Sequence, residues 1–176
     1  MPWPDASGEP WAWFGGRLAT GLLEVTDDLS VLDGSGWWAV VVDFEGRVTC
    51  ARFARVEDAG LPDAAPWRGP ARTAWTSSMS HGDYLAAVEH VREQIALGEV
   101  YQVNVCRVLS VPVPEDAEPA GLATALASGN PAPYAGAVDI PSVGLRVVSA
   151  SPELFLRRAG ATVESGPIKG TARTAS

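Results

Sequence analysis

Short runs of β-branched and aromatic residues, separated by turn residues, fill most of this chain and constrain its fold more than any other feature. The clearest pair is Trp37–Val42 and Arg47–Val56, connected by turn residues at positions 43–46. Such a pattern predicts a β-hairpin. Further strands are predicted at Arg17–Val25, Tyr134–Ile140, Leu145–Ala150, Glu153–Arg158 and Ala161–Ser165, the last two pairing across Ala159-Gly160.

Two segments have helical character instead. The longer is His81–Leu97, where one helical face carries the apolar residues Tyr84, Val88, Val91 and Ile95. Ser80 and Asp83 resemble a capping box, and Gly98 suits the left-handed residue that ends a helix. A shorter helix is predicted at Pro119–Ala127. Strand runs interrupted by two helices predict an α+β fold with antiparallel sheets and packed helices.

A strand is also expected from Val100 to Val111, and it would carry two amides on one face. Strand alternation places Gln102 and Asn104 on the same side, together with Cys106. These amides would line a polar cleft, or else belong to a half-exposed strand face. The pattern alone leaves both interpretations open.

The other segments suggest how the chain divides. Residues 1–14 are rich in Pro, Trp and Gly, and we expect them to fray. Pro62, Pro66, Gly69 and Pro70 within positions 58–76 predict a long surface connection. We therefore expect a variable N-terminal region over residues 1–76, with the hairpin and the Pro-rich connection, and a second domain that begins at residue 77.

Composition narrows the function classes. The chain is 47% hydrophobic, which favours a folded core over disorder, and its net charge of −8 without a basic stripe disfavours nucleic-acid binding. Two cysteines without a C-x-x-C pair predict neither a zinc site nor a disulfide framework, as in a reducing cytosol. We expect a cytoplasmic protein, because the N-terminus lacks signal-peptide features and no apolar run is long enough for a membrane helix.

Lysine usage is the most informative chemical feature. Of the 13 basic residues, 12 are arginine and one is lysine, Lys169. Lysine can lose its proton and attack an electrophile, which arginine cannot do at ordinary pH. Pro167 and Gly170 flank it and would let a ligand approach the backbone closely. The alternative is that an arginine-biased chain has kept one surface lysine in a turn.

Glu153 is a second candidate for chemistry. It follows Ser151-Pro152 at the start of a predicted strand, near apolar residues. A partly buried carboxyl has a raised pKa and can serve as a general acid. The alternative is an ordinary exposed glutamate.

Four motifs in order resemble those of the chorismate-utilising enzymes. Gly98–Asn104 resembles the family's G-[DE]-[IV]-[FY]-Q strand entry, and Asn130–Tyr134 resembles its N-P-x-P-Y segment. Ala150–Phe155 resembles the S-P-E-x-[FL] strand, and Pro167–Thr171 resembles the P-I-[AK]-G-T loop. The resemblance is strong over residues 80–173 and looser over residues 15–56. It implies the N-terminal part of the family's anthranilate synthase component I-like fold, with residues 77–176 as the first part of the chorismate-binding domain.

Two positions indicate which member of the family the chain resembles. The resemblance associates Lys169 with aminodeoxychorismate synthase component I, whereas members like anthranilate synthase carry Ala there. Isochorismate-forming members place a lysine base where this chain has Gln102, which disfavours water as the nucleophile. The chain therefore resembles the aminodeoxychorismate type, which supplies para-aminobenzoate for folate. Alternatives are an anthranilate synthase-like enzyme, an aminodeoxychorismate synthase of a secondary pathway, and a catalytically inactive chorismate-binding fragment.

The resemblance also implies roles for individual residues. Lys169 would attack C2 of chorismate, Glu153 would be the general acid, and Gln102, Gly170 and Thr171 would bind substrate. Mg²⁺ would bridge the substrate carboxylate, and a glutamine amidotransferase subunit or domain would supply ammonia. We expect the Mg²⁺ ligands beyond the end of this chain. On that expectation the isolated chain would expose apolar strand surface, dissolve poorly and show little or no turnover.

Overall fold

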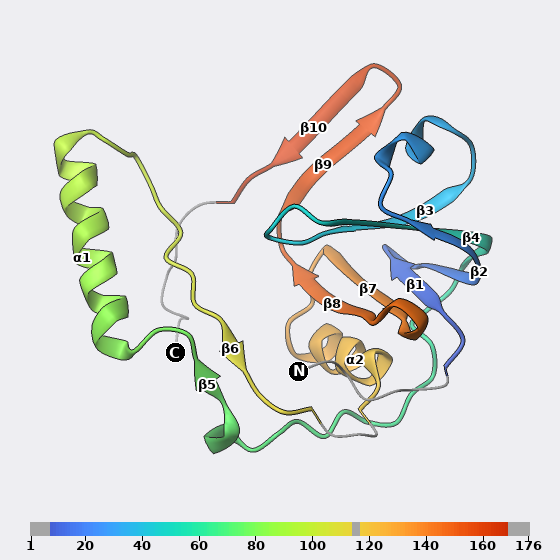
Figure 1. Ribbon diagram of the computed structural model, residues 1–176, viewed down its shortest axis with the longest axis horizontal. Coiled ribbons are helices and arrows are strands. Elements are labelled where there is room, and N and C mark those ends of the chain that lie inside the picture. The colour runs from blue at the N-terminus through green and yellow to red at the C-terminus, as the bar shows by residue number, and fades with distance from the viewer. Residues whose placement is uncertain (1–7, 114–116, 169–176) are drawn as a thin grey trace. The chain divides into compact units, whose positions relative to one another are not determined.

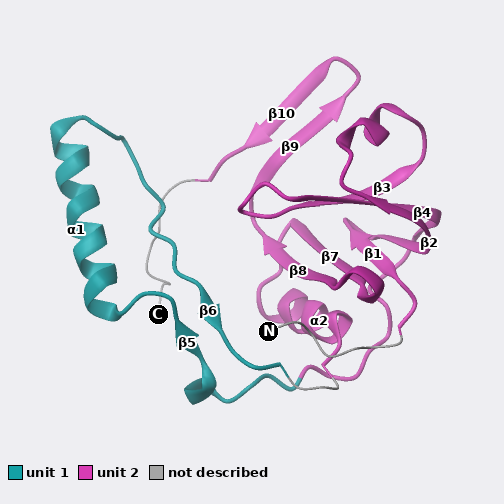
Figure 2. Ribbon diagram, viewed as in Figure 1, with its two compact units in different colours: residues 1, 68–114 teal, residues 2–67, 115–176 magenta. Residues whose placement is uncertain are grey.

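The computed structural model describes residues 8–113 and 117–168, which divide into two compact units (Figures 1 and 2). Unit 1 falls within residues 68–114, and unit 2 falls within residues 2–67 and 115–176. Together they contain antiparallel sheets and two α-helices, so the predicted α+β class is confirmed.

A six-stranded antiparallel sheet forms the body of unit 2, with strand order β3-β4-β2-β1-β7-β8. Its strands are β1 (Trp11–Phe14), β2 (Arg17–Thr26), β3 (Trp37–Val42), β4 (Val48–Asp58), β7 (Tyr134–Ile140) and β8 (Leu145–Ser151). Short 3₁₀ turns follow β2 and β7, at Leu29–Asp33 (η1) and Pro141–Val143 (η3). The hairpin predicted from the sequence is confirmed as β3–β4, with Val42 opposite Val48.

Strand β1 corrects the expectation that residues 1–14 fray, as far as the described residues reach. Trp11 and Ala12 are buried, and the strand lies between β2 and β7 in the sheet. Gly15 and Gly16 both have positive φ and make the tight turn into β2. The partner β7 lies more than 100 residues later in the chain, so local composition could not reveal this pairing.

The two faces of the sheet carry separate apolar clusters. One face gathers small and aliphatic residues around Phe53, namely Ala12, Ala19, Ala39, Ala51, Val138 and Ile140. On the other face, helix α2 (Pro119–Gly129) packs Ala120 and Ala123 against Trp11 and Ala137. The helix was predicted, and it begins with Pro at its first position, as that residue prefers.

Strands β9 (Leu154–Ala159) and β10 (Thr162–Gly166) form a separate hairpin, also in unit 2. Gly160 in the turn has positive φ. Phe155 is 89% exposed, and Leu156 and Val163 are exposed as well. The expected exposed apolar strand surface is therefore present on this hairpin.

Unit 1 contains helix α1 (His81–Leu97) with the predicted termini. Ser80 and Asp83 form the capping box, and Gly98 ends the helix in the left-handed conformation. None of the residues of α1 is buried. The short strands β5 (Thr76–Ser77) and β6 (Leu109–Ser110) pair with each other, and η2 (Arg72–Ala74) precedes them. Between β4 and β5 there is only that 3₁₀ turn, as expected for the 58–76 connection.

The strand expected from Val100 to Val111 is mostly wrong. Only Leu109 and Ser110 are in a strand, because a strand needs a hydrogen-bonded neighbour and β5 offers two residues of pairing. Gln102 and Asn104 consequently lie in irregular backbone, without the alternation of a strand. Gln102 is half-buried and Asn104 is exposed.

Candidate active site

Three of the four family-like motifs meet in unit 2 where β7 begins and β8 ends. Tyr134, the last residue of the N-P-x-P-Y segment, is the first residue of β7. It lies directly opposite Ser151, the last residue of β8 and the serine of the S-P-E motif. Neither residue was singled out from the sequence, because only the cross-strand register shows that the two motifs adjoin.

The hydroxyl of Ser151 organises the turn that carries Glu153. Its Oγ accepts a hydrogen bond from the Glu153 backbone N–H at 3.3 Å and donates one to the Glu153 carbonyl at 3.1 Å. Pro152 lies between them, with a φ restricted by its ring. The backbone of Glu153 is thus held at both its donor and its acceptor just before β9 begins.

The carboxylate of Glu153 contacts the P-I-[AK]-G-T loop. Its Oε2 accepts a hydrogen bond from the backbone N–H of Ile168 at 3.2 Å. The β9–β10 hairpin accounts for this contact, because it folds the chain back so that Gly166 lies opposite Leu154. Two motifs that are 15 residues apart in sequence are thereby joined by a side-chain hydrogen bond.

The environment of Glu153 differs from the expectation in one respect. The residue is exposed, whereas its apolar neighbours in sequence had suggested partial burial. The reason is that the side chains of Phe155 and Leu156 on the following strand point to solvent and do not cover it. Within the described residues, no apolar layer shields this carboxyl from water.

An ion pair borders the site on the hairpin. Nε of Arg157 lies 2.9 Å from Oε2 of Glu164, and a second guanidinium nitrogen contacts the same oxygen. The hydrogen bond that Arg157 donates to Glu164 is the main reason why the pKa of Arg157 is raised, and Tyr134 adds a smaller contribution. The guanidinium therefore stays charged near the start of β7.

Three of the predicted site residues, Lys169, Gly170 and Thr171, lie outside the described residues, and their roles stay predictions. Gln102 belongs to unit 1, whereas Glu153 belongs to unit 2. The structure brings Glu153 to Ile168, which precedes Lys169 and was not itself among the predicted site residues.

A second charged pair is buried at the far end of β7 and β8. Nε of Arg146 lies 3.0 Å from Oδ1 of Asp139, and the Arg146 side chain is only 3% exposed. Burial raises the pKa of Asp139, Arg146 opposes that rise, and Glu118 adds to it. The pair faces the η3 turn, at the opposite strand ends from Tyr134 and Ser151, and we regard it as structural.

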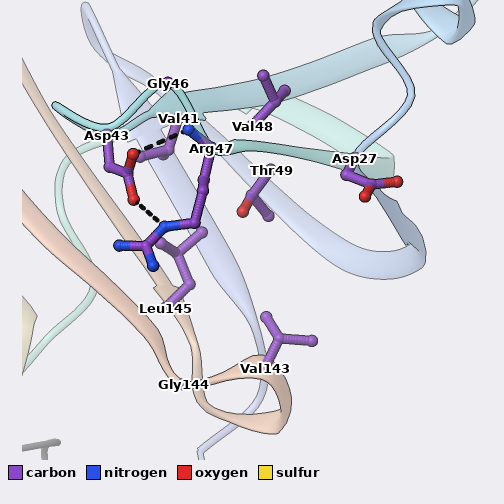
Figure 3. A pocket seen from close by; sticks show the side chains of 10 residues that line it. All are labelled: Asp27, Val41, Asp43, Gly46, Arg47, Val48, Thr49, Val143, Gly144 and Leu145. Carbon is purple, nitrogen blue, oxygen red and sulfur yellow. Dashed lines mark hydrogen bonds and ion pairs between the residues drawn. The ribbon is translucent and has the colours of Figure 1, made fainter.

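Unit 2 also has an open polar pocket of about 690 Å³ between the β3–β4 turn and the η3 turn (Figure 3). In it, Nε of Arg47 donates to Oδ2 of Asp43 at 2.6 Å, and the Arg47 backbone N–H donates to Oδ1 at 2.9 Å. The other lining residues are Asp27, Val41, Gly46, Val48, Thr49, Val143, Gly144 and Leu145. The pocket contains none of the site residues predicted from the sequence.

The described residues do not form a site for Mg²⁺. No group of three or more His, Cys, Asp or Glu side chains within residues 8–113 and 117–168 is arranged to hold a metal ion. In the same part of the chain, no helix has the length and apolarity needed to cross a membrane.

Comparison with known proteins identifies the class. The model of a protein family described as "chorismate binding enzyme" matches residues 47–176, which is more than half of the chain. This match accompanies an antiparallel α+β fold in which Tyr134 lies opposite Ser151 and the Glu153 carboxylate accepts a hydrogen bond from Ile168. The chain belongs to the chorismate binding enzyme family. No solved structure gives a significant match.

Curated relatives carry two kinds of name. An anthranilate synthase component 1 of Thermus thermophilus is 39% identical over 63% of this chain and 23% of its own length. An aminodeoxychorismate synthase of Streptomyces pristinaespiralis is 44% identical over 50% of this chain and 12% of its own. A 2-amino-4-deoxychorismate synthase of Streptomyces globisporus is 32% identical over 88% of this chain and 28% of its own. The chain thus spans between 12% and 28% of the length of these three relatives.

Proposed function

We propose that this protein aminates chorismate in the manner of aminodeoxychorismate synthase component I, with Lys169 as nucleophile and Glu153 as general acid. The observation that supports this most directly is the hydrogen bond from Ile168 N–H to the Glu153 carboxylate. It brings an acid to the residue that precedes the single lysine of the chain.

The proposed reaction divides one difficult displacement into two easier ones. The neutral amine of Lys169 forms a bond to C2 of chorismate while the C4–O bond breaks. Glu153 gives its proton to the departing hydroxyl, which leaves as water. Ammonia then forms a bond to C4 while the bond between C2 and the lysine nitrogen breaks, and the amine of Lys169 is regenerated. The product is 4-amino-4-deoxychorismate.

The other roles are part of the same proposal. Gly170 and Thr171 would hold substrate through a backbone N–H and a hydroxyl, and Gln102 would also bind it. A glutamine amidotransferase subunit or domain would deliver the ammonia, and the product would feed para-aminobenzoate and folate synthesis. Mg²⁺ would be held by residues outside the described part of the chain.

Anthranilate synthase activity is the second candidate, and the names of several relatives favour it. The Thermus thermophilus protein named above and an anthranilate synthase component 1 of Streptomyces coelicolor, 35% identical over 55% of this chain, are examples. Lys169 is the feature of this sequence that favours the aminodeoxychorismate type instead. The two activities differ in the carbon that receives nitrogen, so the product separates them.

The test is product analysis with the full-length protein, chorismate, Mg²⁺ and ammonium ion. We expect 4-amino-4-deoxychorismate, which a lyase converts to para-aminobenzoate. Ortho-aminobenzoate as the sole product would assign the protein to the anthranilate synthase type. Binding of chorismate without any turnover would favour the catalytically inactive alternative.

Substitutions test the residue roles. Lys169→Ala should abolish the chorismate adduct that mass spectrometry detects on this lysine, and Lys169→Arg should do the same although it keeps the positive charge. Glu153→Gln should lower kcat by roughly 10²–10⁴-fold, the usual contribution of a general acid. Glu164→Gln is the matched control, because it changes a carboxylate of the same hairpin that pairs with Arg157 instead. Wild-type turnover by Lys169→Ala would exclude obligatory covalent catalysis.

A further inference from the structure

We propose that Ser151 is a positioning residue that sets the direction in which Glu153 delivers its proton. This inference rests on the proposed function, because it concerns the same acid. It starts from a single hydroxyl that makes two hydrogen bonds to one residue. Oγ of Ser151 accepts from the backbone N–H of Glu153 and donates to its carbonyl oxygen.

The position of Ser151 itself is fixed by the sheet. It is the last residue of β8 and lies in register opposite Tyr134, the first residue of β7. The next residue, Pro152, has little freedom in φ. A side chain anchored on the edge of a six-stranded sheet thus holds a residue that lies outside that sheet.

The far end of Glu153 is fixed by a second contact. The Ile168 N–H donates to Oε2, so that oxygen presents a lone pair to the loop. An oxygen that accepts this bond cannot also direct a hydroxyl proton along the same line. We place the transferred proton on Oε1, because Oε2 already accepts the Ile168 N–H. The contacts at the backbone and at Oε2 together restrict the direction of Oε1.

Loss of the Ser151 hydroxyl would free the Glu153 backbone without removing the carboxyl. A displacement of about 1 Å of a reacting group can cost roughly 10²-fold in rate. Ser151→Ala should therefore lower kcat by roughly ten- to a hundredfold, less than Glu153→Gln does. The KM for chorismate should change little, because the hydroxyl bonds to the backbone of Glu153 and is not proposed to touch substrate.

The experiment measures kcat and KM of the full-length protein with chorismate and ammonium ion. Ser151→Thr and Ser151→Val have nearly the same shape, but only threonine keeps the hydroxyl, so the first should retain kcat and the second should lose it. Ser165→Ala is the control. Its Oγ donates to the Leu154 carbonyl at 3.4 Å on the same hairpin but makes no bond to Glu153, and we expect wild-type kcat.

The outcomes separate this inference from the function on which it rests. Equal kcat values for Ser151→Thr and Ser151→Val, with Glu153→Gln still impaired, would overturn the positioning role alone. Wild-type kcat for Glu153→Gln would overturn the proposed acid and the inference with it. A raised KM with unchanged kcat in Ser151→Ala would indicate substrate contact and would also overturn the positioning role.

Discussion

Helix α2 contains two glycines whose substitution by alanine should have opposite effects on stability. Gly121 lies in the first turn, and a Cβ atom there would come within 2.5 Å of the backbone oxygen of Ala65. Gly129 is the last residue of the same helix, and a Cβ atom there would meet nothing within 4 Å. Neither glycine has positive φ, so both substitutions suit the helical backbone.

Two opposing effects decide whether Gly121→Ala raises or lowers the free energy of unfolding. Alanine is favoured over glycine in a helix by up to about 1 kcal/mol. Overpacking costs about 1–3 kcal/mol, and the contact here is with backbone that cannot rotate away. The backbone near Ala65 is also held from the other side, since its N–H donates to Oε2 of Glu118 at 3.2 Å. We therefore expect Gly121→Ala to lower the free energy of unfolding by about 1–2 kcal/mol.

Urea denaturation followed by tryptophan fluorescence measures the effect. Gly129→Ala is the control, and it should leave the free energy of unfolding unchanged or raise it by up to about 1 kcal/mol. If Gly121→Ala proves as stable as Gly129→Ala, the first turn of helix α2 does not pack against the backbone of Ala65. If both single variants lose the same amount of stability, the cause lies in the helix itself and not in a contact of Gly121.

Three further predictions concern charged groups and thiols. The hydrogen bond from the Arg47 side chain lowers the pKa of Asp43, and the bond from the Arg47 backbone adds to this. The stability that the pair contributes is therefore present above pH 3.8 and is lost as the pH falls through the lower pKa of Asp43 in the folded state. NMR titration should show the Asp43 pKa moving back toward 3.8 in Arg47→Leu, and an unchanged value would contradict the contact. Arg146→Leu leaves the buried Asp139 unpaired and should cost about 3–5 kcal/mol in a urea titration, much of which the double variant with Asp139→Leu should recover. Of the two thiols in the native chain, exposed Cys106 alone should react rapidly with a disulfide reagent, and two fast thiols would show that the sheet is open.

Local signals predicted the elements whose ends are marked in the sequence. Helix α1 was predicted to its first and last residue, because Ser80, Asp83 and Gly98 satisfy its terminal backbone groups. The β3–β4 hairpin was predicted because both arms are rich in strand formers and the turn contains Gly46, which has positive φ. In these cases the residues that decide the structure lie within a few positions of it.

The sequence pattern did not show which strands pair when they lie far apart in the chain. Strand β1 is four residues long and follows a Pro-rich segment, yet it is buried because β2 and β7 flank it. The segment from Val100 to Val111 has the composition of a strand but pairs over two residues only. Strand propensity reflects how well side chains fit a pleated and partly buried surface, so it cannot show whether a neighbour is present.

The contact between Glu153 and Ile168 lies between these two cases. The hairpin predicted across Ala159-Gly160 already folds the chain back on itself, and its turn lies midway between the two residues. Turn position therefore contained enough information to bring the S-P-E carboxyl near the loop that precedes the single lysine. The double hold of Ser151 on the Glu153 backbone was not predictable, because it depends on where β8 ends in register with β7. On the proposed function, the direction of the acid therefore depends on a strand register in the large sheet, through the Ser151 hydroxyl.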